Sequence, residues 1–457
     1  MALTASGDSG QSWSSGYAFV LAAVGAAVGL GNIWKFPYVV GVSGGGAFVL
    51  VYLVCVVFVA IPILIGELLI GRRGSQSPPM AMRKVAKDSG RSSKWSIVGW
   101  MGVLAGYFIA TYYSVIAGWT LTYIFKALNN FGGASPTEVA RQFEALQVDP
   151  WTMTVWHTLF IVLALFIVGR GLQGGIERAV KLLMPALFVM LLVMIGYAAV
   201  EGDFKAGFDF LFSTDFSKID GATVLTAIGQ AFFSIGVAMG LMMAYGAYVP
   251  KSVSLTKSAI IIAGADTLVA LLAGLMIFPL VFANNLDPGS GPGLIFRTLP
   301  TAFAGMAGGA IFGALFFLLL AFAAITSIIS IIEPIVAYAV DKWNMPRRNA
   351  CIIFGFLAWL LGIVSVLSFN QWSGFTPLSM FDAFENKTLY DLIDYFTANL
   401  LMPLGGIGIA LFVGWRLKPD VITEELSFGS AALFQIWLWM IRVVAPVAIA
   451  LVLYSSL

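Results

Sequence analysis

Long apolar runs recur along the whole chain, and they restrict its fold more than any other feature of the sequence. The hydrocarbon core of a bilayer is about 30 Å thick, so one helix needs about 20 apolar residues to cross it. Eleven runs satisfy that rule, at 17–41, 47–71, 97–127, 152–169, 176–200, 222–249, 256–283, 305–340, 350–369, 391–416 and 430–454. They predict an all-α polytopic membrane protein with about eleven transmembrane helices.

The composition supports a lipid environment and excludes several classes of protein. Only 11% of the residues are charged, whereas a typical soluble domain has about 25%. The net charge of +2 argues against a nucleic-acid partner. Cys55 and Cys351 lie in or beside apolar runs, so they predict neither a disulfide framework nor a metal site. His157 is the single histidine, and we interpret it as a structural residue at a helix interface.

The loops between the runs predict the orientation. Loops on one side are rich in basic residues, namely Arg72, Arg73, Arg83, Lys84, Lys87, Arg91, Lys94, Arg170, Arg178, Lys181, Lys251, Lys257, Lys342, Arg347 and Arg348. Loops on the other side carry Glu201, Asp203, Asp209, Asp215, Asp220, Asp382, Glu385 and Asp391. The positive-inside bias makes the basic side cytoplasmic. We therefore expect an inner (plasma) membrane protein with a cytoplasmic N-terminus and an extracytoplasmic C-terminus. The first run is longer than the apolar region of a signal peptide, so we expect it to remain as a helix.

Glycines interrupt two of the runs. The first run contains GAAVGLGN at 25–32, and the sixth contains FSIGVAMG at 233–240. Glycine costs about 1 kcal/mol relative to alanine inside a helix. Paired breaks in corresponding helices indicate an inverted-repeat transporter with its site at the midplane, although close packing of small residues is an alternative explanation. The inverted-repeat interpretation gives one transporter domain, 1–457, with a cytoplasmic segment 1–16, a first repeat 17–200, a second repeat 222–416 and an eleventh helix 430–454.

The segment GAAVGLGNIWKFPY at 25–38, followed by GGGAF at 44–48, resembles the first-helix signature of the neurotransmitter:sodium symporter family. Further matches follow in order along the chain, at Ile61-Pro62 with Glu67, Tyr112-Tyr113, QAFFS at 230–234 and AAITS at 323–327. The resemblance covers all eleven runs and is closest to the bacterial amino-acid branch. It implies a 5+5 inverted repeat with broken first and sixth helices and sodium-coupled amino-acid symport.

The resemblance also implies two sodium sites. The first would use the Ala27 carbonyl and the side chains of Asn32, Ser234 and Asp266. The second would use the carbonyls of Gly25, Val28 and Ala323 with the hydroxyls of Thr326 and Ser327. Helical Thr and Ser hydroxyls also bond to carbonyls one turn earlier. Beside two broken helices we favour ligation, with that local bond as the alternative.

Asp266 departs from the family, which usually has asparagine at this position. A carboxylate in the middle of a span costs roughly 2.5–3.5 kcal/mol on insertion scales, so it indicates a functional role. Near Tyr52, Gln230 and Ser234 it could permanently supply the negative charge that chloride supplies in chloride-dependent relatives. The expected carrier is chloride-independent and can return empty with Asp266 protonated. A structural ion pair is the alternative.

Gly29 occupies the position where monoamine carriers of the family have an aspartate. Glycine leaves room for a substrate carboxylate, which could contact the first sodium, backbone amides and the Tyr113 hydroxyl. The resemblance implies a substrate site formed by Ala27, Gly29, Gly31, Ile109, Tyr113, Phe233, Ser234, Gly236, Met239, Ser327, Ser330 and Ile331. Such a pocket has no fixed charge at its side-chain end, which favours neutral, bulky hydrophobic or aromatic L-amino acids. Taken singly, each of these residues could equally be an ordinary core residue.

The family resemblance also places the gates. Lys35 and Asp394 match the outer ion pair, above an aromatic lid of Phe233 and Tyr113. Trp13 and Asp341 match the cytoplasmic seal, but Gly10 replaces the arginine that normally pairs with the aspartate.

In the fifth run, nine residues separate Gly175 from Pro185, as in the family's unwinding motif for inward sodium release. A simple proline kink is the alternative.

Three other functions predict features that differ from those of a sodium symporter. A proton-coupled amino-acid permease of related fold should carry a basic residue in place of the second sodium. A channel or membrane scaffold should have a continuous polar stripe, which the runs lack. An enzyme should show a nucleophile–base pair or a metal set, and neither is evident.

Overall fold

The computed structural model describes residues 12–130, 134–289 and 293–456, and within them it is all-helical. The first half comprises α1 (Gly16–Ala27), η1 (Gly31–Lys35), α2 (Phe36–Val42), α3 (Gly46–Cys55), η2 (Val56–Ala60), α4 (Ile61–Gly74), α5 (Pro78–Asp88), η3 (Ser93–Trp95), α6 (Ser96–Asn130), α7 (Pro136–Val148), α8 (Pro150–Gly169), η4 (Leu172–Glu177) and α9 (Arg178–Glu201).

The second half comprises α10 (Phe204–Phe212), η5 (Phe216–Lys218), α11 (Gly221–Ile235), α12 (Leu241–Gly246), α13 (Leu255–Ala283), η6 (Leu294–Thr298), α14 (Leu299–Gly305), α15 (Gly309–Trp343), α16 (Arg347–Ser368), η7 (Asp382–Phe384), α17 (Leu389–Tyr395), η8 (Phe396–Leu401), α18 (Met402–Leu411), η9 (Phe412–Arg416), α19 (Pro419–Glu425), α20 (Ala431–Trp439), η10 (Met440–Val444) and α21 (Ala445–Ser456). Here η3, η5 and η7 are 3₁₀ turns and the other η elements are π-helical turns.

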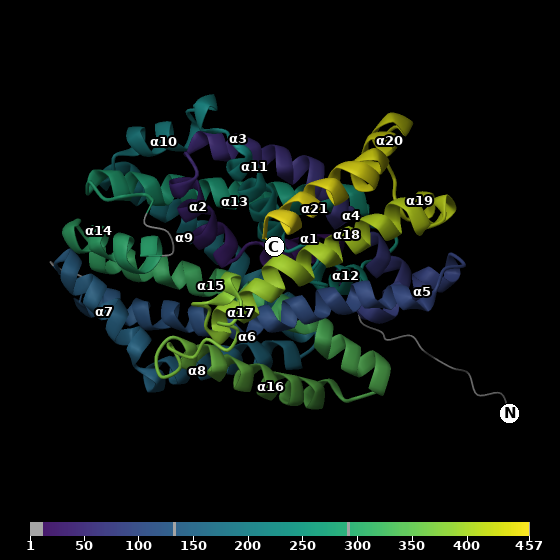
Figure 1. The fold of residues 1–457 in the computed structure, drawn as a ribbon, viewed down its shortest axis with the longest axis horizontal. Coiled ribbons are helices and arrows are strands. Elements are labelled where there is room, and N and C mark those ends of the chain that lie inside the picture. Colours follow the sequence, from purple (N-terminus) through teal and green to yellow (C-terminus); the bar gives the residue numbers. More distant parts are fainter. Residues whose placement is uncertain (1–11, 131–133, 290–292, 457) are drawn as a thin grey trace.

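Long helices run roughly side by side and form one bundle (Figure 1). The short helices α5 and α19 lie at one end of the bundle, and α7, α10 and α14 lie at the other (Figure 1). The two longest helices, α6 and α15, pack along each other, and α15 also packs on α1, α9 and α16.

The described residues contain nine unbroken helices long and apolar enough to cross a membrane, or ten with one bent pair. That pair is Gly16–Ala27 with Gly31–Val42, bent by 49°. The sixth predicted run is split into α11 and α12, each of which is too short to qualify alone. The prediction of about eleven transmembrane helices therefore corresponds to these ten spans and the divided helix formed by α11 and α12.

The second break follows from backbone conformation. α11 ends where Gly236 adopts a φ of +71°, and α12 begins after Gly240 with a φ of +73°. Glycine adopts this left-handed region at little cost. Ala238, between them, has a φ of +62°, which is strained for a residue with a side chain. Its amide donates a 3.2 Å hydrogen bond to the Glu67 carboxylate on α4, and this contact helps to hold the break open.

Candidate substrate and sodium site

The two broken helices lie against each other. Gln230 on α11 donates a 3.1 Å hydrogen bond to the Gly31 carbonyl in the first break. Asn32, in η1, donates a 3.0 Å hydrogen bond to the Ser234 hydroxyl of α11. Such cross-bonds satisfy backbone and side-chain groups that have no water partner in a bilayer. The predicted breaks therefore form one shared site.

Three side chains, Asn32, Ser234 and Asp266, converge beside this contact, and we call them the aspartate cluster. The Asn32 amide lies 2.8 Å from one Asp266 carboxylate oxygen, and the Ser234 hydroxyl donates to the other at 2.7 Å. Asp266 is fully buried on α13. None of the ion pairs between described residues includes it. The cluster thus combines a net negative charge with hard oxygen atoms, a donor set that suits a small hard cation.

A second set of groups lies where α15 meets α1, and we call Val28, Ala323, Thr326 and Ser327 the hydroxyl cluster. The Ser327 hydroxyl crosses to the Val28 carbonyl at 3.1 Å. Thr326 instead makes the local bond, donating to the Ala323 carbonyl at 3.0 Å. A methyl group on Gly25 would lie 3.4 Å from the Thr326 Cβ, so this glycine brings the α1 backbone close to the cluster. The oxygen atoms are neutral, and carbonyl dipoles supply the negative potential.

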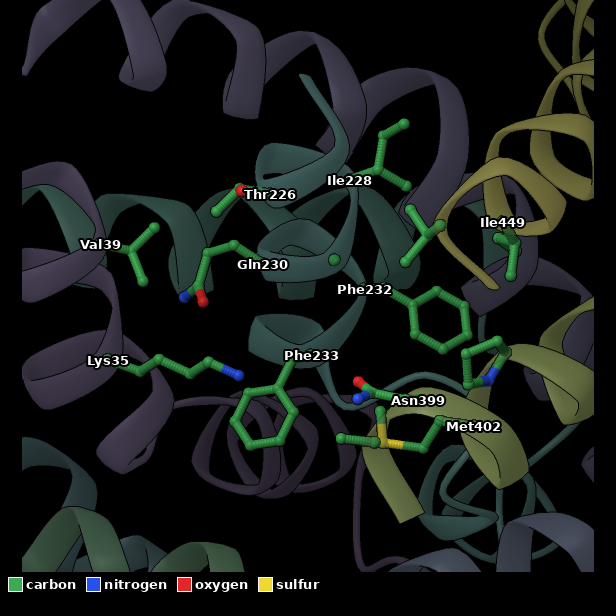
Figure 2. Close-up of a pocket in the computed structure, with 14 residues that line it drawn as sticks. Lys35, Val39, Thr226, Ile228, Gln230, Phe232, Phe233, Asn399, Met402 and Ile449 are labelled. Carbon is green, nitrogen blue, oxygen red and sulfur yellow. The ribbon is translucent and has the colours of Figure 1, made fainter. Parts of the chain in front are cut away.

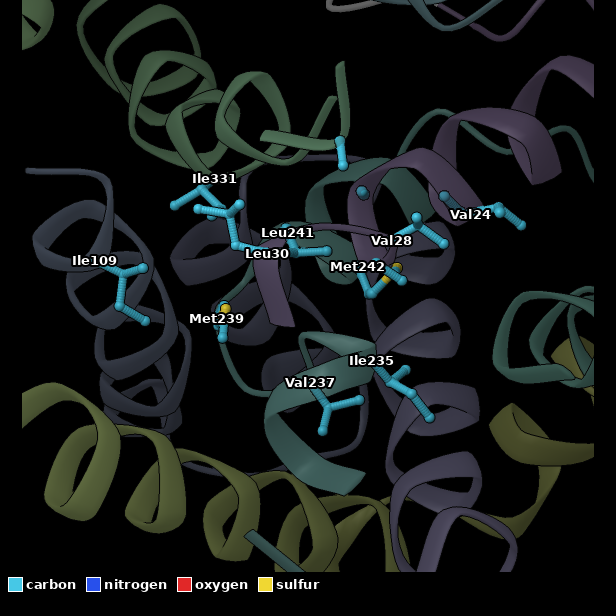
Figure 3. Close-up of a cluster of buried hydrophobic side chains, with 14 of the residues drawn as sticks. Val24, Val28, Leu30, Ile109, Ile235, Val237, Met239, Leu241, Met242 and Ile331 are labelled. Carbon is cyan, nitrogen blue, oxygen red and sulfur yellow. The ribbon is translucent and has the colours of Figure 1, made fainter. Parts of the chain in front are cut away.

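A small pocket of about 30 Å³ lies between the two clusters. It is lined by Ala26, Ala27, Gly29, Leu30, Gly31, Ile109, Tyr113, Phe233, Ser234, Gly236, Met239, Leu241, Ser327 and Ile331. Figure 3 shows several of its apolar side chains gathered between the helices. Its volume is enough for little more than solvent, so a substrate needs the walls to move apart.

Most of these residues are among those that the sequence predicts for the substrate site, with two kinds of exception. Ala26, Leu30 and Leu241 line the pocket but were missed, although the first two lie within the GAAVGLGN motif and Leu241 directly follows Gly240. Ser330, which was named, is absent from the lining. Its hydroxyl lies 2.7 Å from the Tyr245 hydroxyl and donates to the Thr326 carbonyl at 2.9 Å.

The residues around Gly29 leave no room for a side chain at this position. A Cβ at this position would overlap the Ser327 hydroxyl and lie 3.0 Å from the Tyr113 hydroxyl. The Leu30 amide donates to that Tyr113 hydroxyl at 3.3 Å. Among the described residues that line the pocket, this end presents amides and hydroxyls and has no acidic side chain to meet an amine.

The predicted outer gate separates this pocket from a larger cavity of about 310 Å³. Phe233 and Tyr113 line both spaces, as expected for a lid. The Lys35 ammonium lies 4.0 Å from the centre of the Phe233 ring, and Figure 2 shows the two side chains facing each other. Asp394 lines the same larger cavity but accepts a 2.8 Å hydrogen bond from Tyr112. Lys35 and Asp394 thus face one cavity, and no ion pair joins them in the described residues.

On the opposite side, Trp13 is buried and its indole donates to the Tyr245 carbonyl at 3.1 Å. Asp341 accepts a 2.6 Å hydrogen bond from the Ser77 amide at the start of α5. Gly10 lies outside the described residues. Gly175 lies in the wide turn η4 and Pro185 inside α9, so the predicted unwinding segment begins with an irregular helix.

Two broken helices that meet at a small pocket, with a lid on one side and a buried tryptophan on the other, are typical of a secondary transporter. The model of the sodium:neurotransmitter symporter family matches residues 10–133 and 138–457. The sodium-dependent transporter YhdH of Bacillus subtilis is 35% identical over 444 residues, 96% of each chain. A sodium-dependent transporter of Haemophilus influenzae is 33% identical over 463 residues, covering both chains fully.

Among solved structures, that of MhsT in complex with L-phenylalanine is 40% identical and has a TM-score of 0.88. It covers 98% of this chain and 100% of the other. The chain therefore belongs to the sodium:neurotransmitter symporter family. It is a multi-pass membrane protein that carries out sodium-coupled transport, and it is not an enzyme.

Proposed function

We propose that this protein couples sodium entry to uptake of a neutral L-amino acid with a bulky hydrophobic or aromatic side chain. This proposal is based mainly on the residues that surround Gly29. A substrate carboxylate suits the amides of the first break and the Tyr113 hydroxyl, because these groups can donate hydrogen bonds to it. An acidic side chain at position 29 would be excluded by Ser327, so a bare amine has no fixed partner there.

The other end of the pocket selects the side chain. Ile109, Met239, Leu241 and Ile331 are buried and apolar. Figure 3 shows them on different segments: Ile109 and Ile331 lie on α6 and α15, Leu241 begins α12, and Met239 lies in the break before it. They can therefore close around an apolar group from several sides. Methionine adapts its shape readily. MhsT, the structural relative, is bound to L-phenylalanine, which supports an aromatic or large aliphatic substrate for this chain.

Two sodium ions would move with each amino acid, one at the aspartate cluster and one at the hydroxyl cluster. Each sodium charge gains about 2.3 kcal/mol per 100 mV of membrane potential. The Asp266 carboxylate would balance the first sodium without an anion, so transport should not need chloride. The carbonyls and hydroxyls of the second cluster can replace water around a sodium ion without adding charge.

The orientation follows from the two ends of the bundle. The basic helix α5 and the adjacent α19 lie at one end (Figure 1), which we assign to the cytoplasm of a cell with an inner (plasma) membrane. The Tyr395 hydroxyl at the outer-gate end donates to the Ser456 carbonyl at 2.5 Å. The end of α21 would then be extracytoplasmic. Membrane-impermeant labelling of single cysteines placed at positions 87 and 454 tests this assignment.

Radiolabelled uptake into proteoliposomes tests the function, with sodium and chloride varied separately. Phenylalanine, leucine or a similar neutral amino acid should accumulate only with an inward sodium gradient, with or without chloride. Glutamate, lysine and dopamine should compete poorly. Strong competition by an amine that lacks a carboxylate would contradict the role of Gly29. Uptake driven by a proton gradient alone would support the permease alternative.

A further inference from the structure

The first described residues lie across the start of α9. The Ser14 amide donates to one Glu177 carboxylate oxygen at 3.0 Å, and the Ser14 hydroxyl donates to the other. Gln173, also in η4, donates a 2.7 Å hydrogen bond to the Ser12 carbonyl. The segment 12–15 is therefore attached to η4 through both backbone and side-chain bonds.

Lys181 completes this attachment one turn further along α9. Its ammonium lies 2.6 Å from the Glu177 carboxylate and 3.3 Å from the Ser14 hydroxyl. The Glu177 side chain is only 4% exposed. Charge-assisted hydrogen bonds of this kind are about twice as strong as neutral ones. Glu177 is thus a buried acceptor for the segment 12–15, with one positive charge beside it.

The other side of the same segment is bound to the second broken helix. The Trp13 amide donates to the Tyr248 carbonyl at 3.2 Å, and the Trp13 indole donates to the Tyr245 carbonyl. The Trp13 ring lies edge-on to Tyr245, with centroids 5.1 Å apart. Segment 12–15 therefore bridges the start of α9 and the end of α12.

We propose that Glu177 is the positioning residue of the inner gate, because it holds the segment 12–15 against η4 and so keeps Trp13 seated on α12. This inference rests on the proposed function, because uptake requires the inner side to open so that the amino acid and sodium can leave the pocket. Within the described residues, no hydrogen bond or ion pair joins Asp341 to residues 12–15, and Asp341 instead accepts a hydrogen bond from the Ser77 amide. The acid that anchors the segment is therefore at the end of η4, directly before α9 and 164 residues before Asp341.

Glu177 also links the segment 12–15 to the conformation of η4. Glu177 is the last residue of η4, a wide turn that contains Gly175. A Cβ on Gly175 would overlap the Ile167 carbonyl, so the turn depends on that glycine for its close approach to α8. If η4 unwinds, Glu177 moves with it. Release of segment 12–15 and opening of η4 would then be one event.

Hydrogen–deuterium exchange of the full-length protein in nanodiscs, with saturating sodium, tests this anchor without requiring transport. Glu177→Gln removes the charge and places an N–H group against the Ser14 donors. Exchange of amides in residues 13–19 and 245–249 should become faster by about tenfold. Ser14→Ala, which keeps the amide bond to Glu177, should give a smaller change in the same direction. Glu138→Gln, in an exposed ion pair with Arg141, should leave these amides unchanged.

Asp341→Asn tests the alternative that Asp341, and not Glu177, anchors the segment 12–15. We expect it to accelerate exchange near Ser77 and to leave residues 13–19 unchanged. Faster exchange of residues 13–19 in Asp341→Asn but not in Glu177→Gln overturns the proposal, as does normal exchange in both. If wild-type proteoliposomes lack sodium-driven uptake, the proposed function fails, while the exchange results still decide whether Glu177 anchors the segment.

Discussion

The aspartate cluster and the hydroxyl cluster flank the same pocket but have different electrostatics. The Asp266 carboxylate brings a negative charge into the first cluster. Asn32 and Ser234 donate hydrogen bonds to its two oxygen atoms. The second cluster has only neutral groups, held together by the bond from Ser327 to the Val28 carbonyl. A charged site can hold a cation strongly, whereas a neutral site of carbonyls and hydroxyls depends on geometry and releases its cation more easily. As the proposed sodium sites, the two clusters would therefore release their ions at different stages of transport.

The largest expected effect comes from removing the charge of the first cluster. Asp266→Asn keeps an oxygen atom but leaves a bound sodium ion uncompensated in a buried site, which is costly. Uptake in chloride-free buffer should fall by about 100-fold or more. Added chloride should restore part of it by supplying the missing charge. The recovery should be partial because Ala270, one turn away on α13, offers no hydroxyl to an anion.

Asp209→Asn is the matched control, since Asp209 pairs with Lys205 on an exposed helix. It should transport normally with and without chloride. An Asp266→Asn carrier as active as the wild type in chloride-free buffer would refute the electrostatic difference between the clusters.

The next effect concerns the neutral cluster. Thr326→Val combined with Ser327→Ala removes both hydroxyls and leaves the carbonyls in place. The apparent sodium affinity of uptake should fall by about tenfold, and a sigmoidal sodium dependence should become more hyperbolic. Sodium titrations of initial uptake rates measure both changes.

Thr120→Val with Ser114→Ala provides the comparison for that double variant. Both hydroxyls are buried and bond to carbonyls of their own helix, α6, as Thr326 does on α15. This pair should leave sodium dependence unaltered. Equal sodium titration curves for both double variants would mean that the hydroxyl cluster does not bind sodium.

A smaller effect is expected from the apolar wall between the clusters. Leu241→Ala enlarges the pocket next to Gly236, whose added Cβ would lie 3.3 Å from the Leu241 side chain. The preference between leucine and tryptophan should shift toward tryptophan by about three- to tenfold, while the sodium dependence stays the same. Competition assays with Leu268→Ala, a change on an exposed face of α13, give the baseline. An unchanged preference would remove Leu241 from the substrate wall.

The sequence predicts the architecture well because the relevant information is local. Apolar run length predicts the spans, and the glycines at 236 and 240 mark a break that the positive φ angles explain. The family resemblance is confirmed by the match over nearly the whole chain. Contacts between distant segments are harder to predict. Nothing near Ser14 indicates that its partner is Glu177, 163 residues away.

Within the candidate site, the same distinction applies to individual side chains. The motif residues Asn32 and Ser234 come together with Asp266, as the resemblance implied. Ser330 lies one turn after Thr326 and Ser327 on the same face of α15, but its hydroxyl is bonded to the Thr326 carbonyl and to Tyr245 and is absent from the pocket lining. Its contact with Tyr245 could not be read from spacing, since α12 is positioned by the break that precedes it.

Ser330→Ala should have the smallest effect and shows where the hydroxyl cluster ends. Ser330 is fully buried and its loss would leave the Tyr245 hydroxyl without the partner that now lies 2.7 Å away. An unsatisfied buried hydroxyl costs about 1–3 kcal/mol, so the melting temperature should fall while substrate preference and sodium affinity stay the same. Ser365→Ala removes a buried hydroxyl that has no partner within the described residues, and it should not lower the melting temperature. A change in substrate preference in Ser330→Ala would place this residue in the pocket. A loss of sodium affinity would extend the hydroxyl cluster by one helical turn, so that it no longer ends at Ser327.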